Sequence, residues 1–162
     1  MTDGYAIRAI DEKDIDQIAL LEQRCFSVPM TEENIRAFLL GENGVAFVCY
    51  DTQNTDFPST LCAYCGAVCV LDEAQILNVA TAPDHRGRGL GRCVTEALIS
   101  TLKDKGTAYV TLEVRESNSV ARHLYSSLGF YDVGRIKNYY KAPTEDGIIM
   151  KLDIQFDQGG RS

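Results

Sequence analysis

The sequence has no long run of hydrophobic residues and no excess of positive charge. A helix needs about 20 apolar residues to cross a membrane, and the first residues of the chain, Met1-Thr-Asp-Gly-Tyr5, have neither the basic nor the apolar part of a signal peptide. Lys and Arg number 16 against 23 Asp and Glu, a net charge of −7, whereas a protein that coats nucleic acid needs a cationic surface. We therefore expect a cytoplasmic protein that binds neither membranes nor nucleic acid and whose surface suits a basic partner.

The sequence also does not supply a convincing set of metal ligands. It has six Cys and two His, and Cys62-x-x-Cys65 has the spacing of a metal or redox pair. Residues 60–71 alternate as a strand does, which would place these two thiols on opposite faces unless a bulge intervenes. His85 and His123 lie in a predicted loop and a predicted helix, so no second pair completes four ligands. We expect buried thiols and no metal.

The order of predicted elements describes one α/β domain with a mixed sheet. The strand at 74–82, the helix at 92–105 and the strand at 108–114 form a unit whose two strands should be parallel. At 162 residues the chain is too short for two cores, so we expect a single domain over 1–154 and a flexible tail over 155–162. Further strands are predicted at 5–10, 45–51, 60–71, 130–140 and 148–154, and further helices after the caps Asp11, Thr31 and Asn118.

The run His85-Arg-Gly-Arg-Gly-Leu-Gly-Arg92 joins a predicted strand to a predicted helix. Glycines let the backbone turn tightly and approach a ligand, and the N–H groups at a helix start attract anions. Arg86, Arg88 and Arg92 add positive charge. The Gly-x-Gly-x-x-Gly fingerprint of dinucleotide-binding proteins and the Gly-Lys-Ser/Thr ending of the P-loop are both absent. The turn therefore predicts a binding site for a diphosphate of another kind.

Two ionisable side chains follow at the place where a ligand on this turn would react. Open α/β sheets bind ligands beyond the carboxyl ends of their strands, and Glu113 lies at the end of the strand 108–114. Tyr125 lies on the next helix. A carboxylate and a phenol on consecutive elements could supply a base and an acid to one reaction. A solvated carboxylate is the alternative for Glu113.

Several segments carry a resemblance to a known family. Arg86-x-x-Gly89-x-Gly91 resembles the pyrophosphate-binding motif of the Gcn5-related (GNAT) acyl-CoA N-acyltransferases. From about Asp72 to Leu152 the chain is similar to the bacterial ribosomal-protein alanine N-acetyltransferases, most clearly in Leu124-Tyr-Ser-Ser-Leu-Gly-Phe130. This resemblance implies the GNAT fold, a central and mostly antiparallel sheet with one parallel strand pair, flanked by helices. It also implies acetyl-CoA as the cosubstrate and the N-terminal alanine of a basic small-subunit ribosomal protein as the acceptor.

The resemblance gives each candidate residue a role. Glu113 would be the general base, acting through water, and Tyr125 the general acid on the coenzyme sulfur. Asn118 would bind part of the coenzyme. Asn is also a preferred helix N-cap, so both roles stay open for this residue. The remaining coenzyme contacts would be the backbone of Val79, Ala80 and Thr81 for the acetyl-pantetheine arm and Gly87, Arg88, Gly89, Leu90, Gly91 and Arg92 for the pyrophosphate.

The acceptor is less well determined than the coenzyme. Residues 25–30 would form part of the acceptor wall, and they lack the Trp that some relatives carry. One alternative is a GNAT enzyme that acetylates a free small amine, such as an amino acid, a polyamine or a drug. Another is a catalytically silent coenzyme-binding module, against which the presence of both Glu113 and Tyr125 argues. The oligomeric state does not follow from the sequence.

Overall fold

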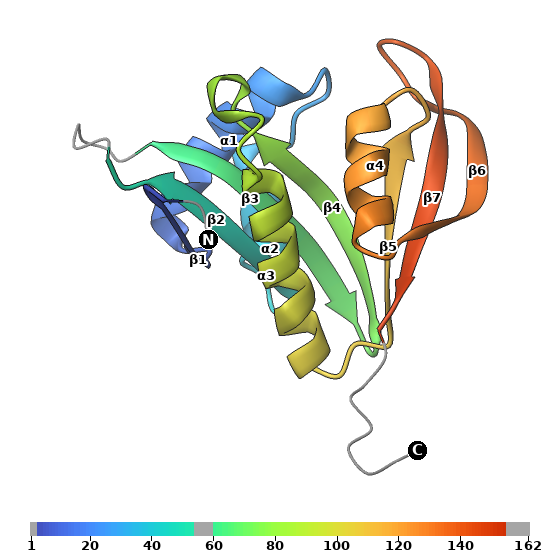
Figure 1. The fold of residues 1–162 in the computed structure, drawn as a ribbon, viewed down its shortest axis with the longest axis horizontal. Coiled ribbons are helices and arrows are strands. Elements are labelled where there is room, and N and C mark those ends of the chain that lie inside the picture. Colours follow the sequence, from blue (N-terminus) through green and yellow to red (C-terminus); the bar gives the residue numbers. More distant parts are fainter. Residues whose placement is uncertain (1–2, 54–59, 155–162) are drawn as a thin grey trace. The chain divides into compact units, whose positions relative to one another are not determined.

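A computed structural model of the protein describes residues 3–53 and 60–154, so the predicted tail 155–162 lies outside the described residues. Seven strands in the described part form one sheet, in the hydrogen-bonded order β1-β2-β3-β4-β5-β7-β6 (Figure 1). The elements are β1 (Tyr5–Ala9), η1 (Glu12–Asp14), α1 (Ile15–Cys25), α2 (Glu32–Leu39), β2 (Gly44–Asp51), β3 (Leu61–Val70), β4 (Glu73–Thr81), η2 (Pro83–His85), α3 (Leu90–Asp104), β5 (Tyr109–Arg115), α4 (Ser119–Ser127), β6 (Tyr131–Tyr140) and β7 (Glu145–Asp153).

The strand directions confirm the predicted mixed sheet. β4 runs parallel to β5, with Gln75 opposite Thr111. The pairs β1–β2, β2–β3, β5–β7 and β6–β7 are antiparallel. The chain folds into two compact units, one of Met1–Val68 with Ile76–Leu98 and the other of Cys69–Gln75 with Ile99–Ser162. The single domain over 1–154 stays a prediction.

In the first unit, α1 and α2 bury their apolar faces against the sheet. Ile15, Ile18 and Leu21 of α1 recur at helical spacing and are at most 2% exposed, and they share one core with α2 and the sheet. Leu39 of α2 fills the space over Gly66, where a Cβ would lie 2.6 Å from the Leu39 Cδ2. Fully burying such an apolar side chain contributes roughly 1.5–3 kcal/mol to stability.

In the second unit, the alternation of β5 sorts its side chains between two faces. Val110, Leu112 and Val114 are buried on one face, and Glu113 is half-buried on the other. The helix α4 ends at Ser127 with Leu128 as its C-cap, and Gly129 follows with a φ of 102°, the left-handed conformation expected just after a helix.

Among the element boundaries that differ from those predicted, two concern the candidate site. Helix α3 begins at Leu90 instead of Arg92, because Leu90 is buried and the Cys93 N–H already bonds the Gly89 carbonyl at 3.0 Å. Strand β5 continues to Arg115 because its pairing with β7 extends that far, so Glu113 lies two residues before the strand end.

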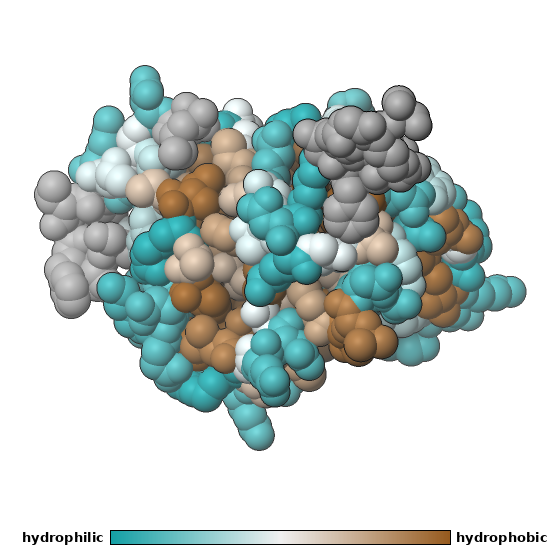
Figure 2. Space-filling view, turned by 90° about the horizontal axis from the view of Figure 1, so that it is seen from below, coloured by the Kyte–Doolittle hydropathy of each residue, from teal (hydrophilic) through white to brown (hydrophobic). Residues whose placement is uncertain are grey.

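The described surface mixes hydrophobic and hydrophilic residues, as the face in Figure 2 shows. Large exposed hydrophobic side chains occur in both units, among them Leu20 at 59% and Leu71 at 97% exposure. Singly exposed hydrophobic side chains are ordinary in globular proteins. Over residues 3–53 and 60–154, no helix is long and apolar enough to span a membrane.

Candidate active site

The glycine-rich turn leads from η2 into α3, and two of its glycines adopt a conformation that favours glycine. Gly87 and Gly89 have φ angles of 79° and 78°, in the left-handed region that costs other residues about 1–2 kcal/mol. A Cβ built at either position would meet no atom within 4 Å. The backbone of the turn therefore faces open space. Gly91 was predicted to belong to the glycine-rich turn, but it is the second residue of helix α3.

The start of α3 supplies hydrogen-bond donors beside these glycines. The first helical bond runs from the Cys93 N–H to the Gly89 carbonyl, so the amides of Leu90 and Gly91 have no acceptor within the helix. Amides in this position, together with the helix dipole, favour an anion. The chain's own geometry thus fits the diphosphate of a coenzyme.

The arginines of the turn brace it against neighbouring elements. Arg86 Nε donates to the Thr81 carbonyl at 3.1 Å, and Arg88 donates to the Tyr5 hydroxyl in β1. Arg92 Nε lies 3.5 Å from Glu96 Oε1 on the next turn of α3. From the sequence, these arginines were expected to provide positive charge for the ligand. Their hydrogen bonds and ion pair within the protein were not predicted.

The predicted binding segment of β4 lies directly before the turn. Val79 and Thr81 are half-buried, and Ala80 is 3% exposed. The Thr81 carbonyl accepts hydrogen bonds from Arg86 and from the Cys25 thiol at 3.4 Å. Burial raises the pKa of Cys25 above its usual value, although Arg86 partly opposes this shift. The thiol beside this strand end is therefore neutral at physiological pH.

Glu113 has a partner that the sequence analysis missed. The Gln75 amide Nε2 donates to Glu113 Oε2 at 2.9 Å. Gln75 lies opposite Thr111 in the parallel register of β4 and β5, and Thr111 and Glu113 share a face because they are two residues apart. The parallel pairing was predicted, so this alternation could have identified Gln75 as a residue that orients the carboxylate.

Two tyrosines of β6 lie within the electrostatic reach of Glu113. Burial, with the charge of Glu113, raises the pKa of Tyr140 to about 12, and the same two causes raise the pKa of Tyr139. Their ring centroids are 5.0 Å apart, and the Arg115 guanidinium lies 4.6 Å from the Tyr140 ring centroid. Both phenols stay neutral, so they offer polar aromatic surface in the unit that holds Glu113.

The helix α4 carries the other two candidates of that unit. Tyr125 is 7% exposed, and its ring lies 5.7 Å from that of Phe130 between centroids. Asn118 caps the helix, since its Oδ1 accepts from the Ala121 N–H at 3.2 Å. The cap interpretation of Asn118 is confirmed, and its coenzyme contact stays a prediction.

Three of the six cysteines, Cys49, Cys62 and Cys65, are buried as predicted, and the other three are partly buried. All six are free, and burial raises the pKa of Cys62 to about 11 and that of Cys65 to about 12. The pairing of β2 and β3 shifts register after Cys49, where Cys62 is the extra residue of β3, so simple alternation fails at this point. Within the described residues, no group of three Cys, His, Asp or Glu side chains could hold a metal ion.

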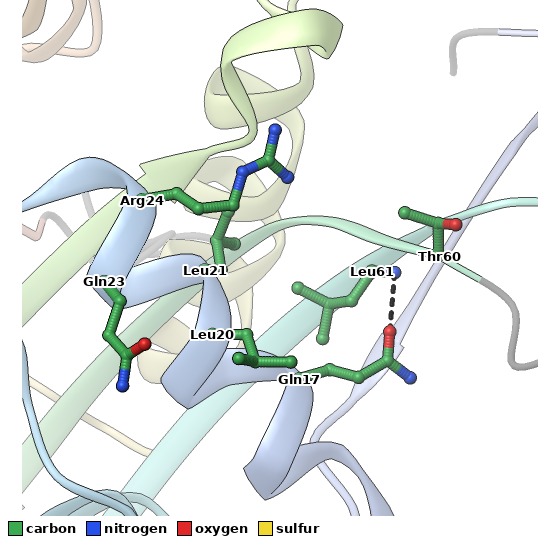
Figure 3. Close-up of a pocket in the computed structure, with 7 residues that line it drawn as sticks. All are labelled: Gln17, Leu20, Leu21, Gln23, Arg24, Thr60 and Leu61. Atoms are coloured by element: carbon green, nitrogen blue, oxygen red, sulfur yellow. Dashed lines mark hydrogen bonds between the residues drawn. The ribbon is translucent and has the colours of Figure 1, made fainter.

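A separate pocket is lined by residues outside the predicted site (Figure 3). One polar contact on its rim joins α1 to β3, from the Leu61 N–H to Gln17 Oε1 at 3.0 Å. Among its described lining residues, Arg24 carries a charge, and it pairs with Asp84 at 3.1 Å. Its lining residues are Gln17, Leu20, Leu21, Gln23, Arg24, Thr60 and Leu61, none of which was predicted to act in catalysis.

Comparison with known proteins tests the family resemblance directly. The family model described as "Acetyltransferase (GNAT) family" matches residues 15–130. The chain belongs to this family. Among GNAT proteins it is similar to the Escherichia coli K12 ribosomal protein bS18-alanine N-acetyltransferase, with 39% identity over 152 residues that cover 91% of this chain and 97% of the relative.

Solved structures of similar proteins agree with the fold. A crystal structure of the ribosomal-protein alanine N-acetyltransferase from Escherichia coli matches with a TM-score of 0.84 and 35% identity, over 98% of this chain and 99% of that one. Arabidopsis thaliana NAA60 in complex with acetyl-CoA has a TM-score of 0.83 at 18% identity, over 93% of this chain and 98% of that one, and it shares the fold. The predictions of the GNAT fold and of an N-acetyltransferase are confirmed, whereas the roles of single residues stay predictions.

Proposed function

We propose that this GNAT enzyme transfers the acetyl group of acetyl-CoA to the N-terminal α-amine of ribosomal protein bS18, at its alanine. The observation that carries this proposal is the 39% identity, over 91% of the chain, to the Escherichia coli enzyme of that name. A cytoplasmic location would follow from this acceptor, because ribosomal proteins are made there.

The coenzyme would bind mainly to backbone groups. The glycine turn and the first amides of α3 suit the pyrophosphate, because Gly87 and Gly89 leave their backbone open. The strand end Val79–Thr81 would hold the acetyl-pantetheine arm. Asn118 uses its Oδ1 as a cap, and an amide has a separate N–H₂ donor, so it would contact the coenzyme through Nδ2.

Glu113 and Tyr125 would move the protons of the reaction. Glu113, oriented by Gln75, would take a proton from the acceptor ammonium through a water molecule. The free amine then attacks the thioester carbonyl carbon, the new C–N bond forms and the C–S bond breaks. Tyr125 would give its proton to the departing thiolate, and a positioned acid or base of this kind typically contributes about 10²–10⁴ in rate.

An α-amine is a better acceptor for this chemistry than a lysine side chain. An N-terminal amine has a pKa of about 7.7–8.0 and a lysine about 10.4, so a carboxylate base deprotonates the former more readily at neutral pH. The net charge of −7 would attract a basic ribosomal protein. Residues Phe26–Met30 would contact the first side chain of the acceptor.

A panel of acceptors separates this function from its alternatives. We expect the enzyme to release coenzyme A thiol from acetyl-CoA when the acceptor is a short peptide that begins with Ala and contains an internal Lys. With the N-terminus of the same peptide blocked, no thiol should be released. A peptide that begins with Phe should react more slowly. Reaction only with spermidine or amino acids would favour the small-amine enzyme, and acetyl-CoA binding without any turnover would favour the silent module.

A further inference from the structure

The first unit holds a carboxylate that the proposed chemistry does not use. Glu22 lies near the end of α1 and is completely buried. Its Oε1 accepts from the Met30 N–H at 2.8 Å. Its Oε2 accepts from the Asn78 amide at 2.8 Å and from the Tyr64 hydroxyl. All three donors are neutral groups.

A second buried carboxylate, that of Asp14, has a charged partner, whereas the donors around Glu22 are neutral. Asp14 is also completely buried, but it forms two hydrogen bonds of 2.8 Å with the Arg8 guanidinium. Burial alone would raise the pKa of Asp14, and the bonds from Arg8 and Tyr50 outweigh that effect and lower it. Burial raises the pKa of Glu22, and its three neutral donors only partly offset this. A charge buried among neutral donors is costly, so a contribution to stability does not by itself explain why a glutamate occupies position 22.

Glu22 closes both ends of the segment that joins α1 to α2. Its backbone carbonyl accepts from the Phe26 N–H at 2.9 Å, and its side chain accepts from the Met30 N–H. Phe26 and Met30 pack against the core, while Val28 between them is 70% exposed. One residue thus fixes the two ends of the linker Phe26–Met30 and leaves its middle at the surface.

The other oxygen of Glu22 is held by the sheet. Tyr64 lies in β3 and Asn78 in β4, and both donate to Oε2. Asn78 directly precedes Val79–Thr81 in the chain. Strand pairing fixes β3 in the sheet without Glu22, so the element that depends on this carboxylate is the linker.

We propose that Glu22 is a positioning residue for the acceptor. It would hold the linker Phe26–Met30 at a fixed place relative to the strand end of β4, so that the linker presents a formed surface to the first residues of the peptide. This inference rests on the proposed function, in which the linker contacts the acceptor and Val79–Thr81 the coenzyme.

The variant Glu22→Gln tests this role. A carboxylate can accept all three hydrogen bonds, whereas an amide of the same shape has one accepting oxygen and an N–H₂ group that only donates. The amide keeps more hydrogen bonds with its oxygen toward Tyr64 and Asn78, and the Met30 N–H then loses its acceptor. A lost hydrogen bond to a charged group costs about 1.5–3 kcal/mol, and 1.4 kcal/mol is a factor of ten. We expect the KM for the Ala peptide to rise about tenfold or more, with kcat and the Kd for acetyl-CoA within about twofold of wild type.

Three comparisons make the test specific. Glu42→Gln makes the same change at an exposed site and should leave every parameter unchanged. Tyr64→Phe removes one donor and keeps the bond to Met30, so it should raise the peptide KM about threefold, and this variant carries the test if Glu22→Gln does not fold. Hydrogen exchange of the Met30 amide should accelerate in Glu22→Gln only.

The outcomes distinguish this inference from the proposed function. If the wild type acetylates the Ala peptide while both variants keep its KM, or if Glu22→Gln keeps the protection of the Met30 amide, the inference is overturned. If the wild type acetylates no peptide at all, the proposed acceptor fails, and with it the role of Glu22 toward that acceptor. A joint loss in kcat, peptide KM and acetyl-CoA affinity would show a general structural role and would also overturn the inference.

Discussion

The proposed role of the glycine-rich turn in coenzyme binding can be tested by adding one methyl group to it. Gly89 has a φ of 78° and Gly106, after α3, has a φ of 84°. A Cβ at either position would meet no atom within 4 Å. Gly89→Ala and Gly106→Ala therefore introduce the same backbone strain and no clash, and they differ in that only Gly89 lies in the proposed site.

The strain sets the expected loss of stability. A left-handed conformation costs an alanine about 1–2 kcal/mol, and in a chain of this size each kcal/mol lowers the Tm by about 2–4 °C. Both variants should therefore melt about 2–8 °C below the wild type. Only in Gly89→Ala would the methyl group occupy space that the diphosphate needs. Loss of one charge-assisted hydrogen bond, about 1.5–3 kcal/mol, corresponds to a 10- to 100-fold weaker Kd.

Two measurements decide the outcome. Thermal unfolding followed by circular dichroism gives the Tm, and isothermal titration calorimetry with acetyl-CoA gives the Kd. We expect equal stability losses and a selective loss of affinity in Gly89→Ala. An unchanged Kd in that variant, or an equal loss of affinity in Gly106→Ala, would refute the assignment of the turn.

Three further predictions concern the chemistry, the core and the thiols. Glu113→Gln and Tyr125→Phe should each lower kcat by about 10²–10⁴ while acetyl-CoA still binds; near wild-type turnover in steady-state assays would make that residue structural. Asp14→Asn should lower the free energy of unfolding by about 3 kcal/mol at pH 7. Because the folded-state pKa of Asp14 is lowered, this difference should disappear as the pH falls below about 3.9 in denaturant titrations. Elemental analysis of the reduced protein should find no stoichiometric zinc, and one bound metal per chain would contradict the buried-thiol interpretation.

Local patterns were sufficient to predict most of the fold. The caps Asp11, Thr31 and Asn118 accept the predicted backbone N–H bonds, because capping depends on a few neighbouring residues. The parallel pair β4–β5 followed from the helix between its strands. The boundaries were less accurate, since the start of α3 depends on the burial of Leu90.

Contacts between distant residues could not be predicted in the same way. The partners of Glu22 lie eight to 56 residues away in the chain, and nothing in the local pattern distinguishes this glutamate from an exposed one. The partner of Glu113 lies on the strand predicted to run parallel to its own, and the observed register places Gln75 near it. The arginines of the turn were predicted as ligand contacts because sequence shows their charge and not their protein partners.

Localisation of the transferred acetyl group tests the central claim most directly. A peptide that begins with Ala and contains lysines would be incubated with acetyl-CoA and either wild type or Glu113→Gln, and the product would be fragmented by mass spectrometry. We expect one acetyl group on the α-amine of Ala with wild type and a product formed at least 100-fold more slowly with Glu113→Gln. An acetyl group on lysine only, or an equal rate with both proteins, would contradict that claim.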